Sequence, residues 1–197
     1  AVKPRFWPAN FRANSVDIMV GVALWAFMIH TDSHMWQIIW TVLHILWIMF
    51  VKPASQTLMV GVQSLVAFLL ALSALFLLLP DGHLLYLVTL TGAICYLAAH
   101  HFFDAFDEAH TKLLSALWAW FSAGVVWVLG HWLLYYVDGL VAQPTVLLVA
   151  IGYGLATLYY FDHTERLSSS VRNQFVFLMV AITAIVLIFS DWGDKLV

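Results

Sequence analysis

The chain has 197 residues, of which 63% are hydrophobic and only 10% are charged, and its formal net charge at pH 7 is −3. Soluble domains carry about 25% charged residues, and a globule of this size leaves much of its surface in contact with solvent. The composition therefore excludes a water-soluble protein and predicts an all-α membrane protein surrounded by the lipid bilayer. The single cysteine, Cys95, excludes a disulfide framework within the chain, and we expect no nucleic acid among its partners.

Residues 1–14 are predicted to form an arm at the cytoplasmic interface of the membrane. This segment does not resemble a signal peptide, because prolines and aromatic residues interrupt its basic residues and no small-residue cleavage site follows the first apolar stretch. Its aromatic side chains would lie among the lipid headgroups and its basic side chains on the phosphates. These residues are Phe6, Trp7 and Phe11 and, among the basic ones, Lys3, Arg5 and Arg12.

Seven apolar segments follow, each of about the length that a membrane helix needs, which is roughly 17 to 25 residues. Polar segments containing Pro, Gly, Asp or Ser separate them, as expected where helices end. We therefore predict a single domain of seven transmembrane helices over residues 15–192, followed by a short external tail at 193–197. The first two helices have only a tight link between them, which favours a hairpin. The segments are 15–31, 35–51, 57–79, 84–103, 112–137, 144–161 and 173–190.

The distribution of Lys and Arg agrees with seven spans. An odd number of spans puts the two termini on opposite sides, and cytoplasmic loops of membrane proteins hold an excess of Lys and Arg. Only Lys195 falls on the C-terminal side, so we predict a multi-pass protein of the cytoplasmic membrane with its N-terminus inside and its C-terminus outside. The cationic residues on the N-terminal side are Lys3, Arg5, Arg12, Lys52, Lys112, Arg166 and Arg172.

A weak internal repeat is visible near the cytoplasmic ends of two spans. The sequence HTKLLS at 110–115 and the sequence HTERLS at 163–168 share four residues, and each follows a Phe-Asp pair. The match indicates one helix followed by three repeated helical hairpins, an arrangement that occurs in transporters and in other membrane proteins.

Histidines and carboxylates gather at the cytoplasmic end of the 84–103 span. If the helix continues beyond residue 103, then His100, Asp104, Asp107 and Glu108 share one face at 3.6 residues per turn. Imidazole nitrogens and carboxylate oxygens on neighbouring helix ends are suitable ligands for Zn, Mn or Fe(II). We therefore predict a divalent-metal site. Its candidate ligands are His100, His101, Asp104, Asp107, His110, Asp162 and His163.

Such a metal site would serve either a membrane enzyme, by lowering the pKa of a bound water, or an ion permeation path. The alternative explanation needs no metal, because polar side chains cap helix ends and charged residues belong at the membrane interface. In that case the chain could be a non-catalytic membrane subunit that packs with other membrane subunits or with copies of itself.

Two further histidines, His44 and His131, lie deeper in the predicted spans. Ionisable residues inside a membrane are costly and indicate function by default. The two imidazoles could be the axial ligands of a haem b, which would make the chain a small haem- or quinone-binding electron carrier. The alternative is that each is a neutral histidine bonded to a neighbouring polar group.

Several membrane functions are disfavoured by residues that the sequence lacks. No lysine lies inside a predicted span, which excludes a retinal Schiff base. No carboxylate lies near the middle of a span, which disfavours proton-coupled transport. The sequence also lacks the glycine-rich phosphate loop, the zinc-protease motif and the serine-hydrolase motif.

Overall fold

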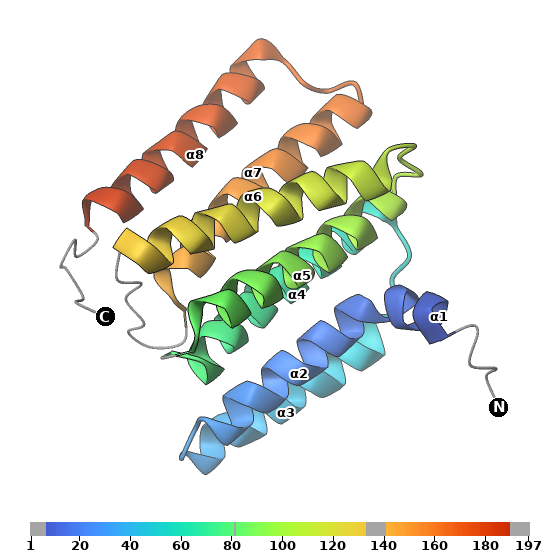
Figure 1. The fold of residues 1–197 in the computed structure, drawn as a ribbon. Coiled ribbons are helices and arrows are strands. Elements are labelled where there is room, and N and C mark those ends of the chain that lie inside the picture. Colours follow the sequence, from blue (N-terminus) through green and yellow to red (C-terminus); the bar gives the residue numbers. More distant parts are fainter. Residues whose placement is uncertain (1–6, 81, 133–140, 190–197) are drawn as a thin grey trace.

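The computed structural model describes residues 7–80, 82–132 and 141–189 (Figure 1). These residues form an all-helical bundle, and six of its helices are long and apolar enough to cross a membrane when α3 and the π-helical segment η2 are taken as one. The elements are α1 (Trp7–Ala13), α2 (Ser15–Ile29), α3 (His34–Leu46), η2 (Trp47–Val51), α4 (Thr57–Leu78), α5 (Leu84–Asp104), α6 (Thr111–Trp132), α7 (Gln143–His163) and α8 (Ser169–Ile188).

The helices match the predicted spans to within a few residues, with two informative differences. The first span is shorter than predicted, because α2 ends at Ile29 and has only 15 residues. The last helix begins earlier than predicted, because the Ser168 hydroxyl accepts a hydrogen bond from the Val171 amide (3.2 Å) and caps α8. The predicted helical residues 133–137 and the predicted tail at 193–197 lie outside the described residues.

Helix α4 is the centre of the bundle, since it packs against α2, α5 and α7. Its contacts use small residues, including the buried Ala67, Ala71 and Ala74, and its Leu72 and Phe76 are completely buried. Small residues let neighbouring backbones approach closely, which matters in lipid because apolar burial does not favour helix association there. Figure 1 shows α2 and α3 on one side of this centre and α7 and α8 on the other.

The hairpins differ in part from the predicted arrangement. Helices α5 and α6 pack as a hairpin, and so do α7 and α8. Helix α3, however, packs against α2, so the first hairpin is α2–α3 and not the pair 35–51 and 57–79. The segment 110–115 also begins α6 whereas 163–168 ends α7. The structure therefore gives the predicted repeat of three hairpins no support.

One end of the bundle, here called the basic end, holds all the Lys and Arg residues within the described ranges. Successive helices alternate in direction, so the start of α2 and the turns before α4, α6 and α8 meet at this end (Figure 1). This is the partition of charge that the sequence predicts for the cytoplasmic side. The residues concerned are Arg12, Lys52, Lys112, Arg166 and Arg172.

A polar network at the basic end joins the first hairpin to α4 and α5. The Asp17 carboxylate accepts a hydrogen bond from the indole N–H of Trp47 (2.9 Å) and forms an ion pair with Lys52 (3.1 Å). The buried Gln63 amide of α4 donates to the carbonyl oxygens of Val51 (2.5 Å) and Ala54 (2.9 Å). The Val51 carbonyl ends η2 and also accepts from the amide of Ala54 (3.1 Å), and the Ala54 carbonyl lies in the turn that follows.

The other end of the same amide reaches α5. The Oε1 atom of Gln63 lies 3.4 Å from Nε2 of His101. A single buried side chain on α4 therefore connects the turn that follows the first hairpin to the helix that carries most of the predicted metal ligands.

Replacing Gln63 should weaken this connection. We expect Gln63→Leu to lower the free energy of unfolding by about 1 kcal/mol, because the Ala54 carbonyl loses its side-chain donor and the Val51 carbonyl keeps only the Ala54 amide, while apolar volume is kept. The measurement is unfolding of the purified protein in mixed detergent micelles. Gln174→Leu on exposed α8 is the matched control and should change stability little; equal effects of the two substitutions would contradict the proposed role.

The alternation of helices predicts which loops share an aqueous compartment. In a chain with the buried Cys95 replaced by Ala, cysteines placed at positions 110 and 163 should both react with an impermeant maleimide from one side of sealed vesicles. A cysteine at position 83, at the opposite end of α5, should react only from the other side. Labelling of positions 110 and 163 from opposite sides would be incompatible with the described bundle.

Candidate functional site

The predicted stripe of metal ligands ends at Asp104, where α5 stops. The next turn closes with hydrogen bonds from the amide of Asp107 to the carbonyl of Asp104 (3.2 Å) and from the amide of Glu108 to the carbonyl of Phe103 (3.3 Å). Asp107 adopts the left-handed conformation (φ 52°), which completes a Schellman motif. The condition for a shared face, a helix that continues beyond Asp104, is therefore not met, because the left-handed Asp107 turns the chain away from the axis of α5.

The seven predicted ligands consequently have different surroundings. His100 is buried against the ring of Tyr96 (5.8 Å between centroids), and His101 lies against Gln63. The other five, which are Asp104, Asp107, His110, Asp162 and His163, are exposed. Within the described part of the chain, no three His, Cys, Asp or Glu side chains form a group that could hold a metal ion. The divalent-metal site remains a prediction from sequence without support from the geometry.

A second Schellman motif ends α7 at the same end of the bundle. Glu165 is left-handed (φ 56°), its amide donates to the carbonyl of Asp162 (2.9 Å), and the amide of Arg166 donates to the carbonyl of Phe161 (2.8 Å). The two motifs stop α5 and α7 side by side at the basic end. This arrangement lets the turn after α5 meet the last residues of α7.

The meeting point is a hydrogen bond between Tyr159 and Glu108. The Tyr159 hydroxyl donates to Oε2 of Glu108 (2.6 Å), and the backbone amide of His110 donates to Oε1 (3.2 Å). These two donors, and more weakly the nearby imidazoles of His110 and His163, hold the pKa of Glu108 below its ordinary value of 4.5. We call Glu108, Tyr159, His110 and His163 the polar mouth.

Aromatic contacts fix the ring of Tyr159 in this position. The rings of Phe103 and Phe106 stand nearly perpendicular to it, with centroids 5.1 and 5.3 Å away. The imidazole of His163 stacks on it at 6.0 Å with an interplanar angle of 15°. Edge-to-face and offset-stacked arrangements are the favourable ones for aromatic pairs, so Tyr159 presents its hydroxyl at a defined place.

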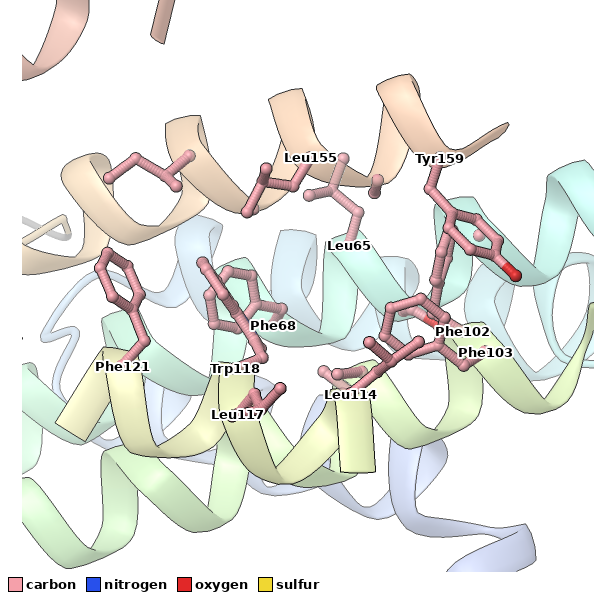
Figure 2. Close-up of a pocket in the computed structure, with 17 residues that line it drawn as sticks. Leu65, Phe68, Phe102, Phe103, Leu114, Leu117, Trp118, Phe121, Leu155 and Tyr159 are labelled. Atoms are coloured by element: carbon pink, nitrogen blue, oxygen red, sulfur yellow. The ribbon is translucent and has the colours of Figure 1, made fainter. Parts of the chain in front are cut away.

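Beneath the polar mouth lies a cavity of about 470 Å³ between α4, α5, α6 and α7. Figure 2 shows Tyr159, Phe102 and Phe103 at one end, Phe121 towards the other, and Phe68 and Trp118 between them. Small residues make the space, notably Gly152, where a Cβ atom would meet Trp118 at 3.1 Å and Phe68 at 3.2 Å. The cavity is thus walled by aromatic rings and kept open by residues with little side chain.

The cavity is open to the surroundings of the bundle between α6 and α7. Leu117, Phe121 and Leu155 line it and are each 43–53% exposed. Its hydroxyl groups have partners, since Ser64 donates to the carbonyl of Val60 (3.0 Å) and Tyr159 donates to Glu108. In a membrane this is an apolar space accessible from lipid, with the polar mouth at the end where Tyr159 lies.

Sequence reasoning did not assign this cavity, although a periodic signal was present. The lining residues of α4 are 61, 64, 65 and 68, and those of α6 are 114, 117, 118 and 121. Both sets have the spacing of a single helix face, and on α7 the residues 152, 155, 156 and 159 repeat it. Small residues followed one or two turns later by aromatic residues on such faces could have indicated it.

The two deep histidines do not converge. Nδ1 of His131 lies 2.9 Å from the carbonyl oxygen of Trp127 on its own helix, and its ring packs on Trp127. His44 lies against Gly21 of α2. Helix α3 packs on α2 whereas α6 packs on α5 and α7, so the arrangement gives an axial pair for haem b within one chain no support.

Comparison of the chain with protein-family models, with curated proteins and with solved structures finds no match.

Removing the phenol hydroxyl should raise the pKa of Glu108 towards 4.5, because Tyr159 is the leading cause of its lowered value. A carboxyl with a lowered folded-state pKa stabilises the fold above its unfolded pKa, and this contribution is lost as the pH falls through the folded-state value. Tyr159→Phe should therefore reduce the dependence of the unfolding midpoint on pH below about 4.5.

The direct measurement is a titration of the Glu108 carboxyl carbon by NMR in micelles. Tyr153→Phe removes another phenol hydroxyl on α7, whose ring packs against Phe175, and should leave the titration unchanged. An unchanged pKa in Tyr159→Phe would show that the hydrogen bond does not exist in solution.

Proposed function

We propose that the chain is a seven-span protein of the cytoplasmic membrane that binds a lipophilic small molecule in the cavity between α6 and α7. The single observation that carries the proposal is the cavity itself, which is apolar, lined by six aromatic rings and open at exposed residues such as Leu155. In this topology α2 is the first span, α1 lies at the interface, and the basic end faces the cytoplasm.

The size and lining of the cavity support this function. Sites for small molecules have volumes of about 300 to 1,000 Å³ and consist mainly of apolar and aromatic side chains with a few polar groups that fix orientation. The cavity, at about 470 Å³, has this composition: the Ser64 hydroxyl on its wall is bonded to the carbonyl of Val60, and the Tyr159 hydroxyl belongs to the polar mouth. Its exposed rim on α6 and α7 faces the region that lipid occupies, so a membrane-dissolved ligand needs no aqueous path.

This proposal agrees with the quinone-binding alternative derived from sequence but does not use haem or metal. The aromatic rings offer flat apolar surfaces to a prenyl chain or a conjugated ring. We therefore describe the protein as a binding protein for a membrane-soluble ligand and assign no catalytic step.

A photoreactive hydrocarbon without a polar headgroup, here called the headless probe, tests whether the cavity binds apolar molecules. In proteoliposomes, a diazirine-bearing hydrocarbon should label peptides that contain Trp118, Phe121 and Leu155, and excess farnesene should suppress this labelling. Labelling of exposed α8 should not saturate, because no residue of α8 lines the cavity. Equal, unsaturable labelling of all lipid-facing helices would contradict the proposal that the cavity binds a ligand.

Filling the cavity gives a matched pair of variants. Ala156→Leu places a larger side chain in the cavity and should reduce the saturable labelling about tenfold, which corresponds to roughly 1.4 kcal/mol of binding free energy. Ala150→Leu makes the same change on α7 at a half-buried residue that does not line the cavity, and it should retain the labelling.

A further inference from the structure

The cavity has a defined direction. Tyr159 and Phe103 lie at the basic end, whereas Ile151 lies eight residues earlier on α7, about 12 Å towards the middle of the membrane at 1.5 Å per residue. A ligand in the cavity would therefore place its apolar part inside the hydrocarbon and its polar group at the mouth, near the membrane interface.

The polar mouth offers hydrogen-bond acceptors. The Tyr159 proton is already engaged by Glu108, so the phenol presents its oxygen lone pair. An ionised carboxylate has about four acceptor positions. On Glu108, two of these positions are occupied by the Tyr159 hydroxyl and by the amide of His110. A ligand that reaches this end is best matched by a group that donates a hydrogen bond.

The charges at the mouth oppose an anionic headgroup. The charged groups that act on the Tyr159 hydroxyl are the carboxylates of Glu108 and Asp162. The imidazoles of His110 and His163 face Glu108, and the Lys52 ammonium at the same end is paired with Asp17. The other cations of the basic end near these helices, Lys112, Arg166 and Arg172, are not among the charges that act on the Tyr159 hydroxyl or on Glu108. A phosphate or a fatty-acid carboxylate would meet two negative charges, and juxtaposed like charges are unfavourable.

We propose that the ligand is a neutral, single-tailed amphiphile with a hydroxyl headgroup, which donates to Glu108 or to the oxygen of Tyr159 while its tail occupies the cavity. This inference rests on the proposed function and adds the class of ligand. The hydroxyl could belong to a prenol, a quinol or a sterol, which share the same head chemistry.

Competition against the headless probe tests the headgroup. Farnesol, farnesyl phosphate and farnesene have the same tail and differ only in the head. Farnesol should displace the probe at a concentration about tenfold lower than either of the others, the effect of one hydrogen bond to a charged acceptor. Equal displacement by all three would overturn the inference and indicate that the cavity takes any apolar chain, including those of bilayer lipids.

Glu108→Gln should change the binding of farnesol and of farnesyl phosphate in opposite directions. The substitution should raise the concentration of farnesol needed to displace the probe about tenfold, because the hydrogen-bond acceptor loses its charge. It should lower the concentration of farnesyl phosphate needed to displace the probe, because one negative charge that repels the phosphate is removed. A purely structural role for Glu108 would weaken both ligands together. Glu165→Gln removes the same charge from an exposed residue at the end of α7 and should change neither ligand.

The outcomes separate the two proposals. Retained, saturable labelling of Glu108→Gln by the headless probe shows that the cavity is intact in the variant. If the unchanged protein prefers farnesyl phosphate, the proposal of a hydroxyl headgroup is refuted, but the proposal that the cavity binds a lipophilic molecule is not. Failure of the headless probe to label the cavity in a saturable way would overturn both proposals.

Discussion

Lipid offers no hydrogen-bonding partner to a polypeptide backbone, and this constraint governs the whole structure. Every span must satisfy its peptide groups internally, so the chain is helical, and the unpaired groups collect where the helices end. At the basic end they are met by particular devices, such as the Gln63 amide on the carbonyls of Val51 and Ala54 and the Ser168 hydroxyl on α8. Polar side chains are thereby concentrated at the ends, and the space between α4 and α7 remains apolar below Tyr159.

The positions of the helices were predictable from the sequence because the same constraint requires long apolar segments separated by polar ones. About twenty apolar residues between polar breaks can only be a span, and the breaks coincide with the helix ends within a few residues. The turn after α5 was not predictable. Left-handed residues at helix ends are usually Gly or Asn, whereas here Asp107 and Glu165 adopt this conformation. The residue type alone therefore does not distinguish a carboxylate in a helix-ending turn from one that continues a metal-binding face.

The cavity depends on pairings that chain order does not determine. Helix α7 packs on α4, which is distant in sequence, while α3 packs on α2 and leaves α4 free to do so. The periodic faces that include Gly61 and Gly152 could each have been turned to lipid or to any neighbour, since all surroundings are apolar. Direction is decided instead by close contacts, such as those of Gly152 with Trp118 and Phe68, and by the bond from Tyr159 to Glu108.

In the proposed seven-span topology, the short α2 would affect the membrane around the protein. With 15 residues, α2 is about 22 Å long, whereas the 22 residues of α4 reach about 33 Å, close to the roughly 30 Å of a hydrocarbon core. Hydrophobic mismatch of this kind is relieved by local thinning of the bilayer. In that topology the leaflets beside α2 would be drawn together relative to those beside α5 and α6, which would favour lipids with shorter acyl chains along that flank.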